Sequence, residues 1–279
     1  QGVMMAARGG ARLADMEFVQ FHPTALDVPR RPLALISEAL RGEGAILVDE
    51  QGKRFMDGVP GAELAPRDVV ARAIHAEIAR GGWTFLDARP ALGDGFSKRF
   101  PGIARLCHEV GIDPTRQPIP VRPAAHYHMG GIATDDQGRS SLNGLWAVGE
   151  CAATGLHGAN RLASNALLEA VVMARRAARN LVEWQAPALQ QSISIASVIP
   201  TSSLGLVRPL VSKNLGVIRD ETGLRGAIAD LLQIVDGNGP AGDPAVVALS
   251  IAVFAALRRD SCGAHFRADY PAAKTKTAS

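Results

Sequence analysis

The spacing of apolar residues predicts different kinds of structure along the chain. At the start, residues 3–16 read as a helix that runs into a strand at Met16–Phe21. From His22 to about Tyr127, short apolar stretches alternate with turns, which is typical of an α+β domain inserted into another architecture. The elements predicted in this part are a helix at 35–41, a strand at 45–49 and a helix at 67–80 that begins after Pro66.

The pattern after residue 128 becomes increasingly helical. A short apolar strand, Gly144–Glu150, precedes a long amphipathic helix at Asn165–Trp184. The stretch Pro187–Pro200 is rich in Gln, Ser and Pro and is predicted to be a linker. Helical patterns at 215–235 and 245–259 follow, so the chain is expected to end in a small helical bundle.

Composition excludes several classes of protein. With 47% hydrophobic and 20% charged residues, the chain has the composition of a globular protein. Its net charge of +3 is spread among acidic residues, so no nucleic-acid partner is expected. The three cysteines form no CxxC pair, which argues against a disulfide framework or a zinc site. No apolar run reaches membrane-spanning length, so we expect no membrane association and a cytoplasmic protein.

Two segments of the inserted domain place unusual polar residues among apolar neighbours. His22 precedes a proline at the expected end of a strand, where it could act in function or serve as a structural histidine. Arg67 stands at a helix start, a position that favours anions over cations. It could help to bind an anion there, or pair with Asp68 or Glu63 on the surface.

Two further segments combine polar residues with glycines. His126 and His128 precede Gly130-Gly131, which would let the backbone approach a ligand or a neighbouring strand closely. The histidine pair lacks a neighbouring carboxylate or cysteine, so a metal site is not expected. Arg161 follows a glycine-containing loop that opens onto a helix, where it could serve an anion site or be an exposed helix-start arginine.

In combination, these segments resemble the succinate dehydrogenase and fumarate reductase flavoprotein superfamily. The resemblance covers the chain from near residue 1 to about 183, and parts of it resemble the L-aspartate oxidases more closely than their dicarboxylate-reducing relatives. The tail Arg258–Pro271 resembles the C-terminal helical domain of that family. The segments that carry the resemblance are Glu17–Leu26, Ser37–Gly44, Arg54–Met56, Glu63–Ile74, Pro123–Ile132 and Gly144–Glu169, and the aspartate oxidase features are Glu63–Asp68, Pro123–Tyr127 and Ala163–Asn165.

The resemblance implies an α+β multidomain protein. Residues 1–16 and 129–186 would be parts of an FAD-binding α/β domain, residues 17–128 a capping domain over the substrate, and residues 190–279 the helical C-terminal domain. The family's N-terminal βαβ unit with GxGxxG, which holds the FAD pyrophosphate, is absent from these residues. The chain alone is therefore expected to be an apo, inactive fragment of the enzyme.

The resemblance also implies a role for each site residue. Arg67 would be the catalytic proton-shuttling arginine. The residues expected to hold or surround the substrate carboxylates are His22, Ser37, Glu38, His126, Arg161 and Ser164. The residues expected at the flavin are Glu150, Ala166 and Leu167, and no metal is expected. Departures from the family pattern fall at Gln1, His128, Ala166 and Cys262.

The implied activity is oxidation of L-aspartate to iminoaspartate by FAD, the first step of de novo NAD biosynthesis. Oxygen or fumarate would accept the electrons, and quinolinate synthase would be a partner. The alternatives are a fumarate reductase or succinate dehydrogenase flavoprotein, and a truncated chain without catalytic activity.

Overall fold

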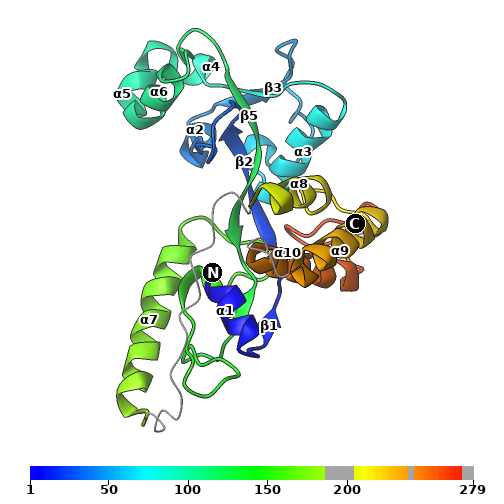
Figure 1. Cartoon of the computed structure of the whole chain (residues 1–279). Helices are drawn as coiled ribbons and strands as arrows, with labels where there is room; N and C mark the ends of the chain where they lie inside the picture. Colours follow the sequence, from blue (N-terminus) through cyan, green and yellow to red (C-terminus); the bar gives the residue numbers. More distant parts are fainter. Residues whose placement is uncertain (186–203, 238–241, 272–279) are drawn as a thin grey trace, which may run out of the picture. The chain divides into compact units, whose positions relative to one another are not determined.

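A computed structural model describes residues 1–185, 204–237 and 242–271. The chain forms two compact units: residues 20–126, here called the inserted unit, and residues 1–19 with 127–279, here called the flanking unit. The linker predicted at Pro187–Pro200 lies outside the described residues. Figure 1 labels the elements along the chain.

The inserted unit contains a four-stranded sheet with the order β2-β5-β4-β3. Leu47, Leu86 and Ile119 occupy facing positions on three neighbouring strands and are at most 1% exposed, so this row anchors the core. The strands are β2 (Val19–Leu26), β3 (Ile46–Val48), β4 (Phe85–Asp87) and β5 (Ile119–His128). The helices are α2 (Glu38–Gly42), η1 (Ala62–Leu64), α3 (Arg67–Ala79), α4 (Arg89–Leu92), η2 (Gly93–Gly95), α5 (Phe96–Arg99) and α6 (Pro101–His108).

The elements of this unit follow the sequence expectations, with two shifts. The helix predicted after Pro66 is confirmed as α3, and the strand at 45–49 is confirmed as β3. The helix predicted at 35–41 begins later, because Ser37 Oγ caps it by accepting from the Ala39 amide at 3.2 Å. The prediction that His22 ends a strand is wrong. Strand β2 continues to Leu26, since the residue before a proline favours extended backbone and Pro23 tolerates it.

The flanking unit contains a small sheet and a long helix. Its sheet has the order β1-β6-β7, with β1 antiparallel and β7 parallel to β6. The predicted strand Gly144–Glu150 is wrong: Trp146 forms an isolated bridge to Arg139, and Gly149, at φ +71°, turns the chain into a 3-10 helix. The elements here are α1 (Gly2–Arg8), β1 (Leu13–Ala14), β6 (Gly131–Ala133), η3 (Gly149–Cys151), β7 (Ala152–Ala153) and α7 (Asn165–Glu183).

The paired glycines at the start of β6 approach neighbouring backbone closely, as predicted. A Cβ on Gly130 would lie 2.1 Å from the carbonyl oxygen of Asp15, and one on Gly131 would lie 2.3 Å from that of Cys151. Gly131 also has φ +155°. Neither position has room for a side chain, so these glycines serve strand packing within the flanking unit.

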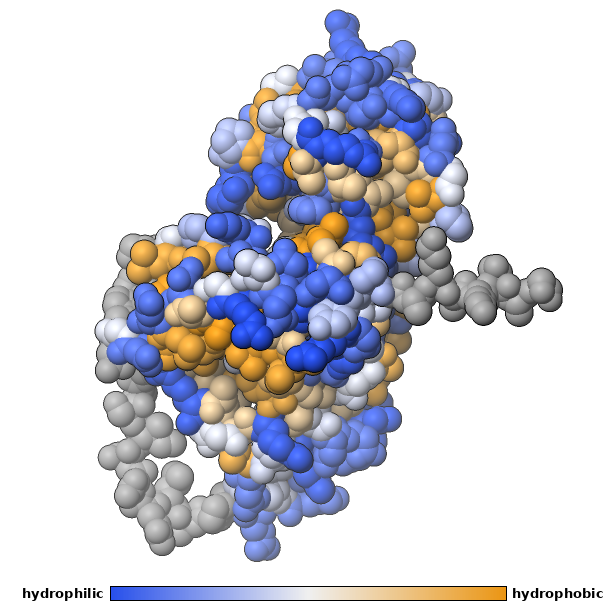
Figure 2. All heavy atoms as spheres, turned by 90° about the vertical axis from the view of Figure 1, so that its right-hand side faces the viewer, coloured by the Kyte–Doolittle hydropathy of each residue, from blue (hydrophilic) through white to orange (hydrophobic). Residues whose placement is uncertain are grey.

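The remainder of the flanking unit is helical, as predicted. Helices α9 (Glu221–Asp236) and α10 (Gly242–Leu257) pack together with α8 (Leu204–Asn214), which the sequence pattern did not reveal because Pro209 interrupts it. Helix α9 begins later than expected, because Asp220 Oδ1 accepts from the Gly223 amide. Figure 2 shows the molecule turned by 90° from Figure 1, and the face seen there mixes apolar and polar side chains. Within the described ranges, no helix has both the length and the hydrophobicity needed to cross a membrane.

A buried polar centre ties the end of the chain to its beginning within the flanking unit. Arg219, 1% exposed, donates from Nη1 to the Glu17 carbonyl at 2.7 Å and to His265 Nδ1 at 3.0 Å. Burial lowers the pKa of Arg219 to about 10. His265 is fully buried, and its Nε2 donates to the Arg258 carbonyl at 3.2 Å. Both ring nitrogens are therefore used by the neutral imidazole.

This centre should make the flanking unit sensitive to acid. Burial, reinforced by the charge of Arg219, lowers the pKa of His265 to about 4, so between about pH 6.5 and 4 the unfolded chain binds more protons than the folded one. The free energy of unfolding should therefore fall as the pH drops through this window. Protonation of His265 in the unfolded chain should account for about 1–2 kcal/mol of that loss at pH 5. Between pH 7 and pH 5, the melting temperature should fall less in the His265→Gln variant than in the parent. An equal loss in both proteins would contradict this role.

Candidate active site

The inserted unit gathers Arg67 with an acid and an amide that are distant in sequence. Arg67 is the first residue of α3, and its side chain is 11% exposed. Its Nε and Nη2 donate to Glu38 Oε2 at 3.0 and 2.7 Å, and its Nη1 donates to Gln20 Oε1 at 3.2 Å. The alternative of a surface pair with Asp68 or Glu63 is wrong, because those carboxylates bind other arginines.

The two other acids considered as partners of Arg67 form ion pairs with different arginines. Arg72 Nη2 lies 2.7 Å from Asp68 Oδ2, and Arg54 donates from Nε to Glu63 Oε1 at 2.9 Å. The Glu63 carboxylate also accepts from the Leu47 amide at 3.1 Å. Glu63 is thus a structural acid that fixes Arg54 and β3, which leaves Glu38 as the carboxylate that orients Arg67.

Arg41 is a buried cation that sequence reasoning did not select. Its side chain is fully buried, with Nη1 donating to the Glu63 carbonyl and Nη2 lying 3.3 Å from Glu38 Oε1. Burial lowers the pKa of Arg41. Burial alone would raise the pKa of Glu38, but the hydrogen bonds and charge of Arg67, together with Arg41, hold it below its usual value. The i, i+3 spacing of Glu38 and Arg41 on α2 is the sequence feature that could have indicated this ion pair.

His22 and His126 come from neighbouring strands, β2 and β5, and their rings meet edge to face. The ring centroids are 5.3 Å apart with an interplanar angle of 78°. Burial, then the charges of Arg67, His126 and Arg41, lower the pKa of His22 to about 3. His22 is therefore neutral at pH 7. Since its Nδ1 accepts from the Thr24 amide at 3.3 Å, its proton sits on Nε2, which can donate to a ligand.

Arg161 and Ser164 belong to the flanking unit. Arg161 is only 7% exposed, which rules out the alternative of an exposed helix-start arginine. Its guanidinium carbon lies 4.4 Å from the centroid of the Tyr127 ring, and its Nη1 donates to the Leu162 carbonyl at 3.4 Å. Ser164, at φ +68°, is the N-cap of α7, but its side chain makes no capping hydrogen bond.

The start of α7 provides features that fit a flavin. Because the N-cap Ser164 makes no side-chain hydrogen bond to this 19-residue helix, the first N–H groups can face the electron-rich edge of a ring. Leu167, in the first turn, is 78% exposed, while Ala166 packs against the small cluster of Phe18, Tyr127, Met129 and Ala264. Glu150 Oε1 accepts from the His128 amide at 3.0 Å. The apolar and donor groups of α7 thus suit the isoalloxazine part of FAD.

Three of the four departures from the family pattern have local partners in the flanking unit. The ring Nε2 of His128 lies 2.9 Å from the Met16 carbonyl, and burial lowers the pKa of His128. Cys262 pairs with His265 through two backbone hydrogen bonds of 2.9 and 3.0 Å. Ala166 packs in the cluster just described. Gln1, at the N-cap of α1, makes no capping bond with its side chain.

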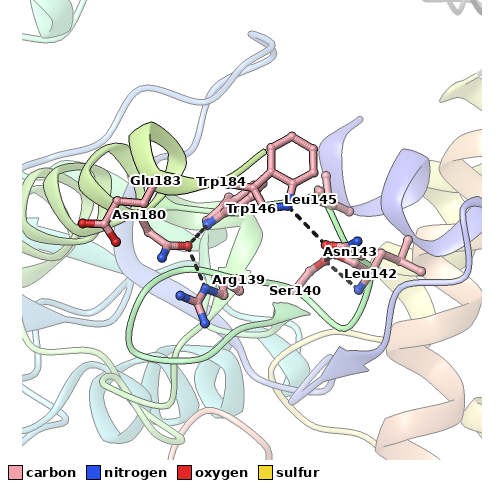
Figure 3. Close-up of a pocket in the computed structure, with 10 residues that line it drawn as sticks. Arg139, Ser140, Leu142, Asn143, Leu145, Trp146, Asn180, Glu183 and Trp184 are labelled. Atoms are coloured by element: carbon pink, nitrogen blue, oxygen red, sulfur yellow. Dashed lines mark hydrogen bonds between the residues drawn. The ribbon is translucent and has the colours of Figure 1, made fainter. Parts of the chain in front are cut away.

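A separate pocket of about 420 Å³ lies on the flanking unit, and no residue assigned by the resemblance lines it. Asn180 Oδ1 accepts from Arg139 Nε at 2.7 Å and from Trp146 Nε1 at 3.1 Å, and Trp184 lies beside them (Figure 3). In the part of the chain that the structure describes, no group of three His, Cys, Asp or Glu side chains is arranged to hold a metal ion.

Comparisons with known proteins agree with the resemblance. The family profile "FAD binding domain" matches residues 1–167, and "Fumarate reductase flavoprotein C-term" matches residues 242–277. The L-aspartate oxidase of Agrobacterium fabrum is 65% identical over 97% of this chain and 52% of its own length. That of Rhodospirillum rubrum is 51% identical over 81% of this chain and 86% of its own length.

A solved quinol-fumarate reductase with menaquinol molecules superposes with a TM-score of 0.85 at 30% identity, covering 99% of this chain and 58% of that one. The chain spans about half the length of most of the curated relatives it matches. The matches over the FAD-binding region, the C-terminal helices and nearly the whole described chain lead to one assignment. The chain belongs to the family of flavoproteins with this FAD binding domain and, within it, to the L-aspartate oxidases.

Proposed function

We propose that the full-length protein oxidises L-aspartate to iminoaspartate with FAD, and that oxygen or fumarate reoxidises the flavin. The substrate loses a hydride from Cα and a proton from nitrogen, and the C=N bond forms. FAD, when bound, accepts the hydride. The observation that carries the proposal is Arg67, which the Glu38 carboxylate holds with two hydrogen bonds in the unit that also pairs His22 with His126.

In this proposal the residues of the inserted unit, as the capping domain, bind and orient one end of the substrate. The neutral His22 donates from Nε2, and His126 offers a second imidazole next to it. Ser37 and Glu38 line the same part of the unit at the start of α2. Neutral donors cost less to bury than cations and still orient a carboxylate.

Arg67 is proposed to relay the proton: as the guanidinium takes a proton from the substrate nitrogen, it passes one of its own to the Glu38 carboxylate that it already donates to. The carboxylate accepts from two guanidinium nitrogens, and Arg41 lies on its other oxygen, so the three side chains form a continuous row. The hydrogen bonds between Arg67 and Glu38 can pass a proton without a large movement of either side chain, and the ion pair with Arg41 holds the Glu38 carboxylate in place. Within the flanking unit, Arg161 and Ser164 are proposed to bind a substrate carboxylate, and Glu150, Ala166 and Leu167 to contact the flavin.

The product of this reaction is an imine, which water hydrolyses readily. An enzyme that consumes iminoaspartate must therefore act soon after its release, and we propose quinolinate synthase as that partner.

Turnover of aspartate against succinate by the full-length protein tests the proposed function. We expect flavin reduction by L-aspartate under anaerobic conditions, followed by reoxidation with oxygen or fumarate. D-Aspartate and L-glutamate are the matched controls for stereochemistry and length. Reduction by succinate alone would replace the proposal with a succinate dehydrogenase or fumarate reductase activity.

A further inference from the structure

Arg161 lies on a ring whose own position is fixed by other side chains. The Tyr127 ring, under the Arg161 guanidinium, is 8% exposed and belongs to the flanking unit, so this stack lies within one unit. A flat guanidinium that stacks on an aromatic face directs its N–H groups outward in its own plane, the direction from which a carboxylate can accept from them. The ring therefore restricts which way the fork of Arg161 can point.

Tyr127 also contacts a buried polar pair. The His157 ring meets Tyr127 edge to face, with centroids 5.5 Å apart and an interplanar angle of 88°. His157 Nε2 lies 2.8 Å from Glu169 Oε2, and their side chains are 6% and 3% exposed. Glu169 also accepts from Thr154 Oγ1. A buried glutamate on α7 thus fixes the histidine, and the histidine fixes the tyrosine.

We propose that Tyr127, held by His157 and Glu169, is a positioning residue that orients the Arg161 guanidinium toward one substrate carboxylate. This rests on the proposed role of Arg161 in the site. The aromatic ring of Tyr127, rather than its hydroxyl, orients the guanidinium. Burial, with the charges of Glu169 and Glu150, raises the pKa of Tyr127 to about 12, so at pH 7 the residue offers Arg161 an uncharged aromatic face.

Removing the ring while keeping bulk tests the proposal in the full-length enzyme. We expect Tyr127→Leu to raise the KM for L-aspartate about tenfold, equivalent to about 1.4 kcal/mol, with kcat within about threefold of the parent. Tyr127→Phe, which keeps the face and loses the hydroxyl, should restore the parent KM. If Tyr127→Leu does not fold, Tyr127→Met provides a flexible side chain of similar volume for the same comparison.

Phe18 supplies a matched control. Its ring lies 4.9 Å from the guanidinium carbon of Arg258, and it is 5% exposed in the same apolar cluster as Tyr127. Phe18→Leu should lower the melting temperature about as much as Tyr127→Leu but leave the KM unchanged. An equal rise in KM in both variants would mean that Tyr127 is only structural, and would overturn the proposal.

A double-mutant cycle separates an effect through Arg161 from any other. In an Arg161→Ala background, Tyr127→Leu should cause no further loss of kcat/KM, whereas additive losses would overturn the proposal. Succinate binding can be measured without turnover, from the change that it causes in the flavin absorbance. If the enzyme binds succinate through a Tyr127-dependent site but does not oxidise aspartate, the proposed function fails and the inference stands. If aspartate is oxidised and Tyr127→Leu keeps the parent KM, the inference alone fails.

Discussion

The Arg67→Ala variant of the full-length enzyme should bind FAD normally but lose reduction of the flavin by L-aspartate. In the parent, three nitrogens of Arg67 are fixed by Glu38 and Gln20, and alanine removes all of these contacts and the proton carrier together. A positioned acid or base contributes about 10²–10⁴ in rate, so we expect reduction to slow by at least about 10³-fold. Anaerobic mixing with aspartate, read at the flavin absorbance maximum, measures this rate.

Arg72 offers the matched control for this experiment. It lies on the same helix α3 and its Nη2 pairs with Asp68 at 2.7 Å, so Arg72→Ala removes a cation and an ion pair but leaves the contacts between Arg67 and Glu38 in place. Its flavin should be reduced at close to the parent rate. Arg67→Lys should remain as slow as Arg67→Ala, because an ammonium cannot reproduce the forked contact. Rapid reduction in Arg67→Ala would remove this residue from the mechanism.

Much of the fold was predictable because local signals were strong. Pro66 marks the start of α3, and a continuous amphipathic pattern marks α7, whose predicted start at Asn165 is confirmed. The prediction failed where a turn interrupts an apolar run. The apolar run at Gly144–Glu150 looked like a strand, but the turn at Gly149 ends it before a ladder forms. The strand propensity of an apolar run does not by itself show where the run is interrupted.

The site was predictable only in part, for a related reason. Motifs selected Arg67, His22 and His126, and the structure brings these into one unit. The partners of Arg67 were not visible as pairs, because Glu38 and Gln20 lie 29 and 47 residues away in sequence. Whether a cation faces solvent or an acid depends on such distant contacts. Resemblance therefore identified individual residues, whereas the structure shows which of them act on one another.

The buried pair of arginines around Glu38 determines how that residue should respond to mutation. Arg41 is fully buried and Arg67 is 11% exposed, so both cations rely on one carboxylate that is shielded from solvent on much of its surface. A carboxylate shared by two cations stabilises the folded inserted unit, and it provides the negative charge between Arg67 and Arg41 in the proposed row. Removing its charge should consequently affect stability and catalysis together.

The Glu38→Gln variant should separate the charge of this residue from its shape. The amide oxygen of glutamine can still accept from Arg67, but the counter-ion of two cations is lost. We expect kcat to fall about 100-fold, since the proton relay loses the carboxylate that takes a proton from Arg67, while KM changes little. The unfolding free energy should fall by about 2 kcal/mol, because two partly desolvated cations remain uncompensated. Steady-state kinetics and thermal unfolding measure the two effects.

Glu43 provides the comparison for Glu38, since it follows the same helix α2 and pairs with Arg99 at 2.5 Å in a solvent-exposed ion pair. Glu43→Gln removes one carboxylate charge within five residues of Glu38, yet it should change stability by less than about 1 kcal/mol and leave kcat unchanged. A Glu38→Gln enzyme that matches Glu43→Gln in kcat would show that Arg67 exchanges its proton with water or substrate directly. The row of Arg67, Glu38 and Arg41 would then only hold α2 and α3 together.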